Sequence, residues 1–336
     1  MAMSTHSGPR PASGRIRDTA LLGLALVSLT AVSAWSLFIG VSDIGLSDLL
    51  RAESSKMLLF VVSRVPRLAA ILLSGSAMGV VGLIMQSLVR NRFVAPTTAG
   101  TVDAASLGLV IATIWFASAS VFLKMTVAVV FALAGTALFM ALVQRLRYAD
   151  IIVVPLIGIM LGGVIQAAAT FLALRYDLLQ SLSAWTNGDF SGILRGRYEL
   201  LYLVGALTAL AYLFANRFTL AGMGRDVAVN LGVNYLRVLY GGMALAATVA
   251  AVVVVVVGGI PFLGLVVPNL VTMTMGDNLR RVLPLTAVSG AFFVLACDIV
   301  SRTIRFPYEI PVGTVVGVVG GGLFLALVLR SRFNAG

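Results

Sequence analysis

Charged residues are scarce in this sequence of 336 residues: Asp, Glu, Lys and Arg together make up 11%, against 60% hydrophobic residues. A soluble domain carries roughly 25% charged residues, so most of this chain is not expected to face water. Apolar runs of about 20 residues recur along the chain, which is the length that crosses a bilayer as an α-helix. The alternating pattern of a membrane β-barrel is absent. The sequence therefore predicts an all-α polytopic membrane protein without a separate soluble domain.

Cysteine and histidine are almost missing as well. The single cysteine, Cys297, excludes an intrachain disulfide and a thiolate metal cluster, and the single histidine, His6, lies in a polar segment. The chain has no GxxxxGK[ST] motif, so it does not bind ATP through a P-loop, and it has neither HExxH nor GxSxG. We therefore expect no enzymatic activity, no metal site and no cofactor in this chain.

The net charge of +11 could indicate nucleic-acid binding, but the basic residues are spread over short loops between apolar runs. That distribution follows the positive-inside rule of membrane proteins, so we expect contact with membrane lipid and none with nucleic acid. Residues 1–17 are polar and contain Arg10, Arg15 and Arg17. They are predicted to be a disordered cytoplasmic tail.

The remaining residues, 18–332, are predicted to form a single transmembrane domain. Eight apolar runs read as single spans: 19–41, 68–89, 98–116, 125–143, 151–174, 199–215, 282–300 and 310–329. The stretch 238–275 has no charge and is broken by glycine and proline, so it contains either two short crossings or one crossing with a partly re-entrant helix. With both termini cytoplasmic the number of spans must be even, which gives about ten transmembrane helices.

Residues 216–237 form a polar island between two long apolar runs. Two glycines, Gly222 and Gly224, mark a turn, and Asp226 favours a helix N-terminus just after it. Val227 and Leu231 are four residues apart and share one face of a short helix. We expect Gly232 to end that helix and Asn234 to cap the next one. The island is either a helix built to dock at the cytoplasmic membrane surface or a solvated loop with incidental helicity.

Several arginines fall in segments expected outside and weaken the inside bias of positive charge: Arg64, Arg67, Arg195, Arg197, Arg302 and Arg305. Arg64 and Arg67 flank Pro66, which suits the first turn of a helix, and are three residues apart on one face. They and Arg302 either dock acidic side chains of an outside partner or snorkel at the membrane interface.

Two carboxylates, Asp103 and Asp298, fall near or within predicted spans. An intramembrane carboxylate is a functional hypothesis: a proton relay, a cation ligand or a buried structural acceptor. As structural acceptors they would bind small polar neighbours such as Thr101 or Ser301. If either carboxylate bound a transported ion, the chain would be an ion-coupled secondary transporter, and this is an alternative function for the chain.

The sequence GGIPFLGLVVPN at 258–269 places glycines and prolines inside an apolar run. Irregular backbone at membrane depth is tolerated where it is buried in protein or lines a cavity, and such breaks often mark a translocation path. The candidate path residues are Gly258, Gly259, Pro261, Phe262, Gly264, Pro268 and Asn269. Close packing alone could also require them.

Four segments in order resemble the FecCD-type permeases, the membrane subunits of ABC importers for ferric siderophores, haem and vitamin B12. They are RVPRLAAILLSGSAMGVVGLIMQSLVRNRFVAP at 64–96, GRDVAVNLGVN at 224–234, GGIPFLGLVVPNLV at 258–271 and RRVLPLTAVSGAFFVLACDIVSRTIRFPYEIPVG at 280–313. The sequence TVDAA at 101–105 and the pair Pro268-Asn269 depart from the commonest family pattern. They resemble the subgroup serving catecholate, petrobactin- and anguibactin-type siderophores.

The resemblance implies a type II ABC importer permease in the bacterial cytoplasmic (inner) membrane. It implies a dimer with a second permease, identical or paralogous, two cytoplasmic ABC ATPase subunits that hydrolyse ATP, and a periplasmic or lipid-anchored siderophore-binding protein. It assigns docking of that binding protein to Arg64, Arg67 and Arg302. It assigns ATPase coupling to the island, at Gly224, Arg225, Asp226, Val227, Ala228, Leu231 and Gly232.

Overall fold

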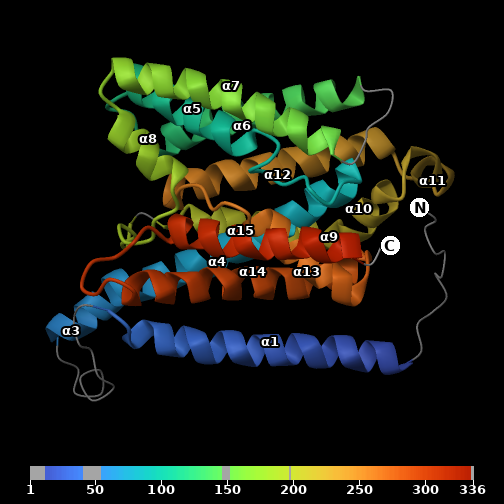
Figure 1. The fold of residues 1–336 in the computed structure, drawn as a ribbon. Helices are drawn as coiled ribbons and strands as arrows, with labels where there is room; N and C mark the ends of the chain where they lie inside the picture. The colour runs from blue at the N-terminus through green and yellow to red at the C-terminus, as the bar shows by residue number, and fades with distance from the viewer. Residues whose placement is uncertain (1–11, 41–53, 146–151, 197, 334–336) are drawn as a thin grey trace.

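The computed structural model describes residues 12–40, 54–145, 152–196 and 198–333, and that part of the chain contains helices and loops but no strand (Figure 1). The first helices are α1 (Ala12–Phe38), α3 (Ser54–Leu59), the π-helical turn η1 (Phe60–Arg64), α4 (Val65–Val89), α5 (Thr101–Trp115), α6 (Val121–Gln144), α7 (Val153–Arg175) and α8 (Leu179–Thr186). The rest are α9 (Leu201–Leu213), α10 (Ala215–Gly222), α11 (Arg225–Asn230), α12 (Tyr235–Val257), α13 (Leu263–Met275), α14 (Leu279–Thr303) and α15 (Val312–Phe333). Much of the predicted tail, residues 1–11, lies outside the described residues, and α1 begins at Ala12 within the range predicted as tail.

Seven helices in the described part are long and apolar enough to cross a membrane, and the number rises to eight if α9 and α10, bent by 62°, form one broken span. Two further apolar helices, α5 and α13, are shorter, with 15 and 13 residues. The chain is therefore a multi-pass, all-helical membrane protein. The number of ten spans stays a prediction, because it requires both short helices to count as crossings.

The second span begins earlier than the sequence predicts. The apolar helix runs from Lys56 to Val89 over 34 residues, whereas the prediction placed its start at Leu68. The apolar residues Met57 to Val62 continue the helix through the π-helical turn η1, so Arg64 and Arg67 lie along the helix. Of the segment predicted to precede the span, residues 42–67, the part 42–53 lies outside the described residues.

The uncharged stretch 238–275 resolves into one long and one short helix. The long helix α12 has 23 residues and ends at Gly258, and α13 has only 13. At 1.5 Å per residue α13 is roughly 20 Å long, shorter than a hydrocarbon core of about 30 Å. A short second helix is compatible with both predicted arrangements, two short crossings or one crossing with a partly re-entrant helix.

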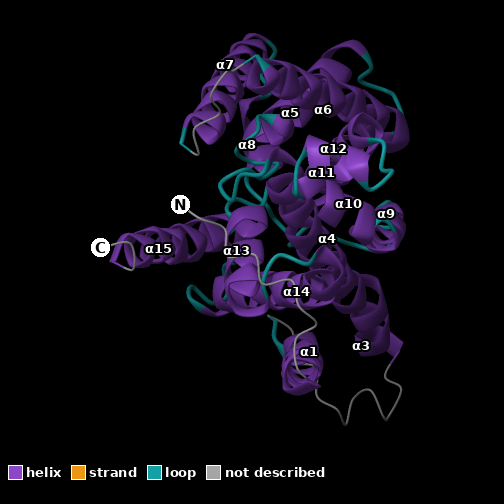
Figure 2. Cartoon of the chain, turned by 90° about the vertical axis from the view of Figure 1, so that its right-hand side faces the viewer, coloured by secondary structure: helices purple, strands orange, loops and turns teal. Residues whose placement is uncertain are grey.

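Helix α4 lies in the middle of the bundle, with α1 at the edge (Figure 2). It packs against α14, α12 and α13, and close contacts there depend on glycine. A Cβ atom on Gly82 would lie 2.1 Å from the carbonyl oxygen of Gly264 in α13, and one on Gly75 would lie 2.8 Å from that of Gly290 in α14. Such contacts bring helix backbones together where lipid provides little hydrophobic driving force for association.

The helices place functional segments at opposite ends of the bundle. In Figure 1 the start of α1, the end of α15 and the short helix α11 lie at one end, and α3 lies at the other. The first and last described helices therefore share an end with the polar island. This arrangement agrees with both termini lying on the side of the island.

The glycine contact between α4 and α13 gives a stability prediction. Gly82→Ala forces a Cβ against a backbone oxygen that cannot rotate away, so we expect overpacking to cost about 1–3 kcal/mol. The matched control is Gly163→Ala in α7, where nothing lies within 4 Å of the added Cβ and alanine favours the helix. Thermal unfolding in detergent should show a lower Tm for Gly82→Ala alone. Equal Tm values for the two variants would contradict the tight contact.

Candidate functional site

In the polar island, residues 216–222 belong to α10, and the short helix α11 follows between two turns. Gly224, at φ +116°, precedes α11, and Gly232, at φ +75°, follows it, two conformations that glycine adopts more readily than other residues. The Asn234 side chain then accepts a hydrogen bond from the Arg237 backbone N–H at 3.0 Å and caps α12. The predicted turn, helix stop and cap are confirmed.

Helix α11 turns one residue inward and leaves its other apolar residues exposed. Ala228 is buried and Val227 is 38% exposed, whereas Leu231, predicted to share a helix face with Val227, lies in the turn just after the helix and is 59% exposed. Arg225 and Asp226 are exposed at the start of the helix. The helix packs on α10 and α12, and Val227 and Leu231 lie uncovered at one end of the bundle. The coupling role of this surface stays a prediction.

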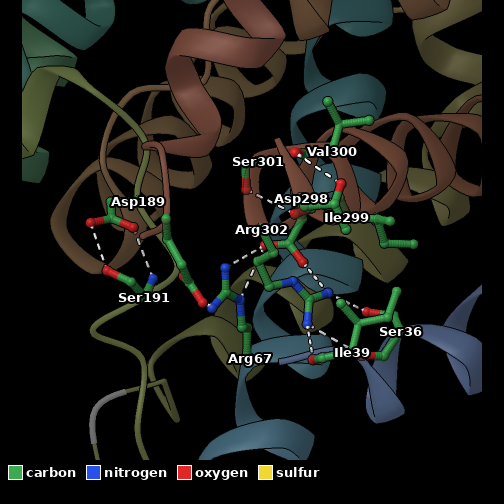
Figure 3. Close-up of polar contacts among 12 residues, drawn as sticks. Ser36, Ile39, Arg67, Asp189, Ser191, Asp298, Ile299, Val300, Ser301 and Arg302 are labelled. Carbon is green, nitrogen blue, oxygen red and sulfur yellow. Dashed lines mark hydrogen bonds and ion pairs between the residues drawn. The ribbon is translucent and has the colours of Figure 1, made fainter. Parts of the chain in front are cut away.

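At the opposite end, Asp298 of α14 lies between two of the predicted docking arginines (Figure 3). Its Oδ1 accepts hydrogen bonds from Arg67 Nε at 3.1 Å and Nη2 at 2.8 Å, and its Oδ2 lies 2.5 Å from Arg302 Nη2. The Asp298 side chain is fully buried and that of Arg302 is 4% exposed. A buried charge requires such pairing, because leaving it unpaired in the protein interior is costly. We call Asp298, Arg67 and Arg302 the ion-pair cluster.

The cluster also holds the end of α1. Arg302 Nη1 donates to the Ile39 carbonyl at 2.8 Å and to the Ser36 carbonyl at 3.2 Å, and Arg64 Nη1 donates to the same Ile39 carbonyl. The last carbonyls of a helix have no partner within it, and arginine side chains satisfy them here. Arg64, Arg67 and Arg302 therefore have structural partners in addition to any docking role.

Arg67 has a second carboxylate partner. Its Nη1 lies 2.7 Å from Glu309 Oε2, in the segment that joins α14 to α15, and Glu309 is more exposed than Arg67. The same segment presents exposed side chains of Ile304, Phe306 and Tyr308. Of the predicted docking residues, Arg67 is thus the one that connects the buried cluster to the surface. Docking by Arg64, Arg67 and Arg302 stays a prediction.

The sequence did not predict that Asp298 pairs with both Arg67 and Arg302. The expectation that Asp298 binds small polar neighbours is wrong: Ser301 Oγ donates to the Asp298 backbone carbonyl, and the carboxylate binds arginine. The spacing of Asp298 and Arg302, four residues apart on one helix, was a signal that could have indicated half of the cluster. The bond from Arg67 spans 231 residues and has no local signature.

The predicted helix break is irregular and its backbone is paired. Gly258 and Phe262 have φ of +84° and +57°. Gly259 N–H donates to the Trp185 carbonyl at 3.0 Å, and the Gly259 carbonyl accepts from Gly188 N–H at 2.7 Å. The end of α8 and the loop after it therefore supply hydrogen bonds that helical geometry would otherwise provide, as is required at membrane depth.

The seven candidate path residues separate into two groups. Gly259 and Pro261 line a recess of about 230 Å³ together with Thr97, Val102, Asp103, Gln166 and Thr186. The others pack inside the protein or at its edge: Gly258, Gly264 and Pro268 are buried, Phe262 stacks on Phe324, and Asn269 donates to the Arg92 and Leu265 carbonyls. A path role stays a prediction for all seven.

Asp103 and Asp298 have different surroundings. Asp298 is held by two arginines, whereas Asp103 faces the recess. Within the described ranges no three His, Cys, Asp or Glu side chains are placed to hold a metal ion. Gln166 was not predicted as a site residue. It is the only amide side chain in the apolar helix α7, which is a signal that could have identified it.

Comparison with known proteins identifies relatives along nearly the whole chain. A petrobactin import system permease protein of Bacillus subtilis, YclN, is 48% identical over 92% of this chain and 98% of its own length. The ferric-anguibactin transport system permease protein FatD of Vibrio anguillarum is 41% identical over 91% and 97%. A solved metal-chelate type ABC transporter in an inward-facing conformation superposes with a TM-score of 0.80 at 23% identity, covering 93% of this chain and 99% of that one.

The last structure shares the helical fold, and the sequence relatives are permeases. The model of the FecCD transport family matches residues 27–330. That range includes the short helix α11, the helix break and the ion-pair cluster. The chain therefore belongs to the FecCD transport family.

Proposed function

We propose that this chain is the membrane-spanning permease subunit of an ATP-driven ABC importer that moves a ferric siderophore across the bacterial cytoplasmic membrane. The observation that carries this proposal is the near full-length similarity to permeases of petrobactin and ferric-anguibactin import, at 48% and 41% identity. The chain supplies the path, and partner ATPase subunits hydrolyse ATP. The ion-coupled alternative has no support, since two arginines neutralise Asp298 and the relatives are ABC permeases.

The proposal includes the finer architecture. Ten helices cross the membrane when the bent pair α9–α10 and the short helices α5 and α13 are counted with the seven long ones. Both termini are cytoplasmic, on the side of α11. A second permease, identical or paralogous, completes the path, and a periplasmic or lipid-anchored binding protein delivers the ferric siderophore.

Helix α11 is the coupling element in this proposal. Its exposed Val227 and Leu231 provide an apolar face of the kind that seats in a groove on a partner, and Arg225 and Asp226 flank it. Because α11 is attached by glycine turns at both ends and packs on α10 and α12, movement of the ATPase is passed to the short helix α10 and the long helix α12.

The outer end is the docking surface for the binding protein. Arg67 is held by Glu309, and an acidic side chain of the partner would compete with Glu309 for the same guanidinium group. Asp298 and Arg302 stay buried beneath, so they position Arg67 and need not touch the partner.

The coupling role predicts the effect of a double change, Val227→Asp with Leu231→Asp. Replacing the exposed apolar face by charge should reduce the ATPase that co-purifies in mild detergent by about tenfold or more and abolish ATP-dependent uptake, because apolar anchors dominate such interfaces. The control is Asn230→Asp, which adds charge to the same helix and removes no apolar side chain. Unchanged co-purification and uptake, with the protein present in the membrane, would refute the assignment.

The docking role predicts that Glu309→Gln strengthens association with the binding protein. Removing the internal competitor leaves Arg67 available, so affinity should rise severalfold at low salt, and the gain should shrink as salt screens the contact. Asp189→Asn is the control, since it also removes an acidic charge and the Asp189 carboxylate accepts hydrogen bonds from Ser191 and not from an arginine. Affinity measured by surface plasmon resonance on the transporter in nanodiscs tests this. An unchanged or lower affinity for Glu309→Gln would show that Arg67 does not dock an acidic group.

A further inference from the structure

The recess beside the helix break joins three parts of the fold. Val102 and Asp103 come from the first turn of α5, Gln166 from α7, and Gly259 and Pro261 from the break between α12 and α13. Gln166 lies near the middle of the 23-residue helix α7. The recess holds about 230 Å³, which is enough for a small polar group such as an amine with its neighbouring atoms.

The carboxylate of Asp103 is accommodated there by the absence of a side chain opposite. A Cβ atom on Gly162 of α7 would lie 2.5 Å from Asp103 Oδ2, so only glycine leaves room for the carboxylate. Asp103 also lies in the first turn of α5, where the helix dipole favours a negative charge. The glycine gives the carboxylate space, and the helix dipole partly offsets the cost of an isolated charge at this depth.

No cation of the described residues neutralises Asp103. The ion pairs in that part of the chain engage Asp298, Glu309 and Asp277. Asp298 meets two arginines, and Asp103 meets none. The recess therefore contains an acceptor whose charge is uncompensated by the protein itself.

A second acceptor in the recess also lacks a partner. The Oε1 atom of Gln166 is buried and accepts no hydrogen bond. Leaving a buried acceptor without a donor is unfavourable, and such a group in a native structure calls for an explanation. An anionic acceptor without a cationic partner and a neutral acceptor without a donor lie in one recess, and together they are complementary to a group that is cationic and donates more than one hydrogen bond.

We propose that Asp103 and Gln166 form a subsite for an ammonium group of the transported chelate as it passes the helix break. The subsite rests on the proposed import function, because it assigns part of the cargo to the recess. Asp103 provides the charge, and Gln166 Oε1 accepts a second N–H of the same group. Gly259 and Pro261 close the other side with backbone and ring atoms, so the contact is weak enough to release the cargo.

A thiol-labelling experiment tests the charge of the recess without relying on transport. Thr186, which lines the recess, is changed to cysteine in a Cys297→Ala background, and the assembled transporter is treated with cationic and anionic thiosulfonate reagents of similar size. We expect the cationic reagent to react about tenfold faster, and Asp103→Asn to abolish that preference. Asp277→Asn, which changes an exposed carboxylate elsewhere, should leave the preference intact.

Equal rates for the two reagents would overturn the proposal, and so would failure of either reagent to reach the cysteine. Retention of the co-purified ATPase shows that each variant is folded and assembled. Gln166→Leu should leave the charge preference in place, since it removes an uncharged acceptor. A preference that survives Asp103→Asn would assign the charge to another residue and refute the role of Asp103.

Uptake by cells tests the ligand class, using two ferric chelates that differ only in a free primary amine and its acetylated form. Asp103→Asn should lower uptake of the amine-bearing chelate about tenfold and leave the acetylated one within about twofold. Gln166→Leu should have the same selectivity with a smaller effect. An equal loss for both chelates would indicate a structural role and overturn the subsite. If the unaltered transporter moves neither chelate while the labelling preference holds, the proposed import function fails and the cation-binding subsite stands.

Discussion

Close backbone contact around α4 is the constraint on which the other features depend. Lipid tails are as apolar as the helix surfaces, so burial alone does not hold transmembrane helices together, and tight packing must contribute. Gly75 and Gly82 let α14 and α13 approach α4 to distances that no side chain would allow. This contact fixes α13 beside α4, and with it the position of the break that precedes α13. It also places α14 so that Asp298 reaches Arg67 on α4.

The ion-pair cluster accounts for the positive charge at the end of the bundle opposite α11, which the sequence predicts to lie outside. Arg67 and Arg302 are compensated by one buried carboxylate, and Arg302 and Arg64 satisfy carbonyls at the end of α1. Removing one partner would leave a buried charge unpaired, which is far more costly than the pair itself is stabilising. The cluster therefore secures the helices beneath a surface where Glu309 and Arg67 remain accessible to a partner.

The segments proposed to be functional lie at the two ends of the bundle and at the break between α12 and α13. Helix α11 presents exposed apolar residues at one end, and the Arg67–Glu309 pair lies at the other. In the break between α12 and α13, both backbone groups of Gly259 are paired with the end of α8 and the loop after it, which supports an irregular backbone at membrane depth. Membership of the FecCD transport family accounts for this division, because an importer permease must meet a delivery protein, a cargo and an ATPase.

The sequence by itself determined the features that depend on local patterns. Apolar runs located most helices within a few residues, glycines located the break and the ends of α11, and Asn234 was recognisable as a cap because capping acts within three residues. Tertiary structure decided the start of α4 and the short length of α13. It alone joined Arg67 to Asp298 and brought Gln166 into one recess with Asp103. Periodicity says which face of a helix a residue occupies, but which helix it meets follows from packing between segments far apart in the chain.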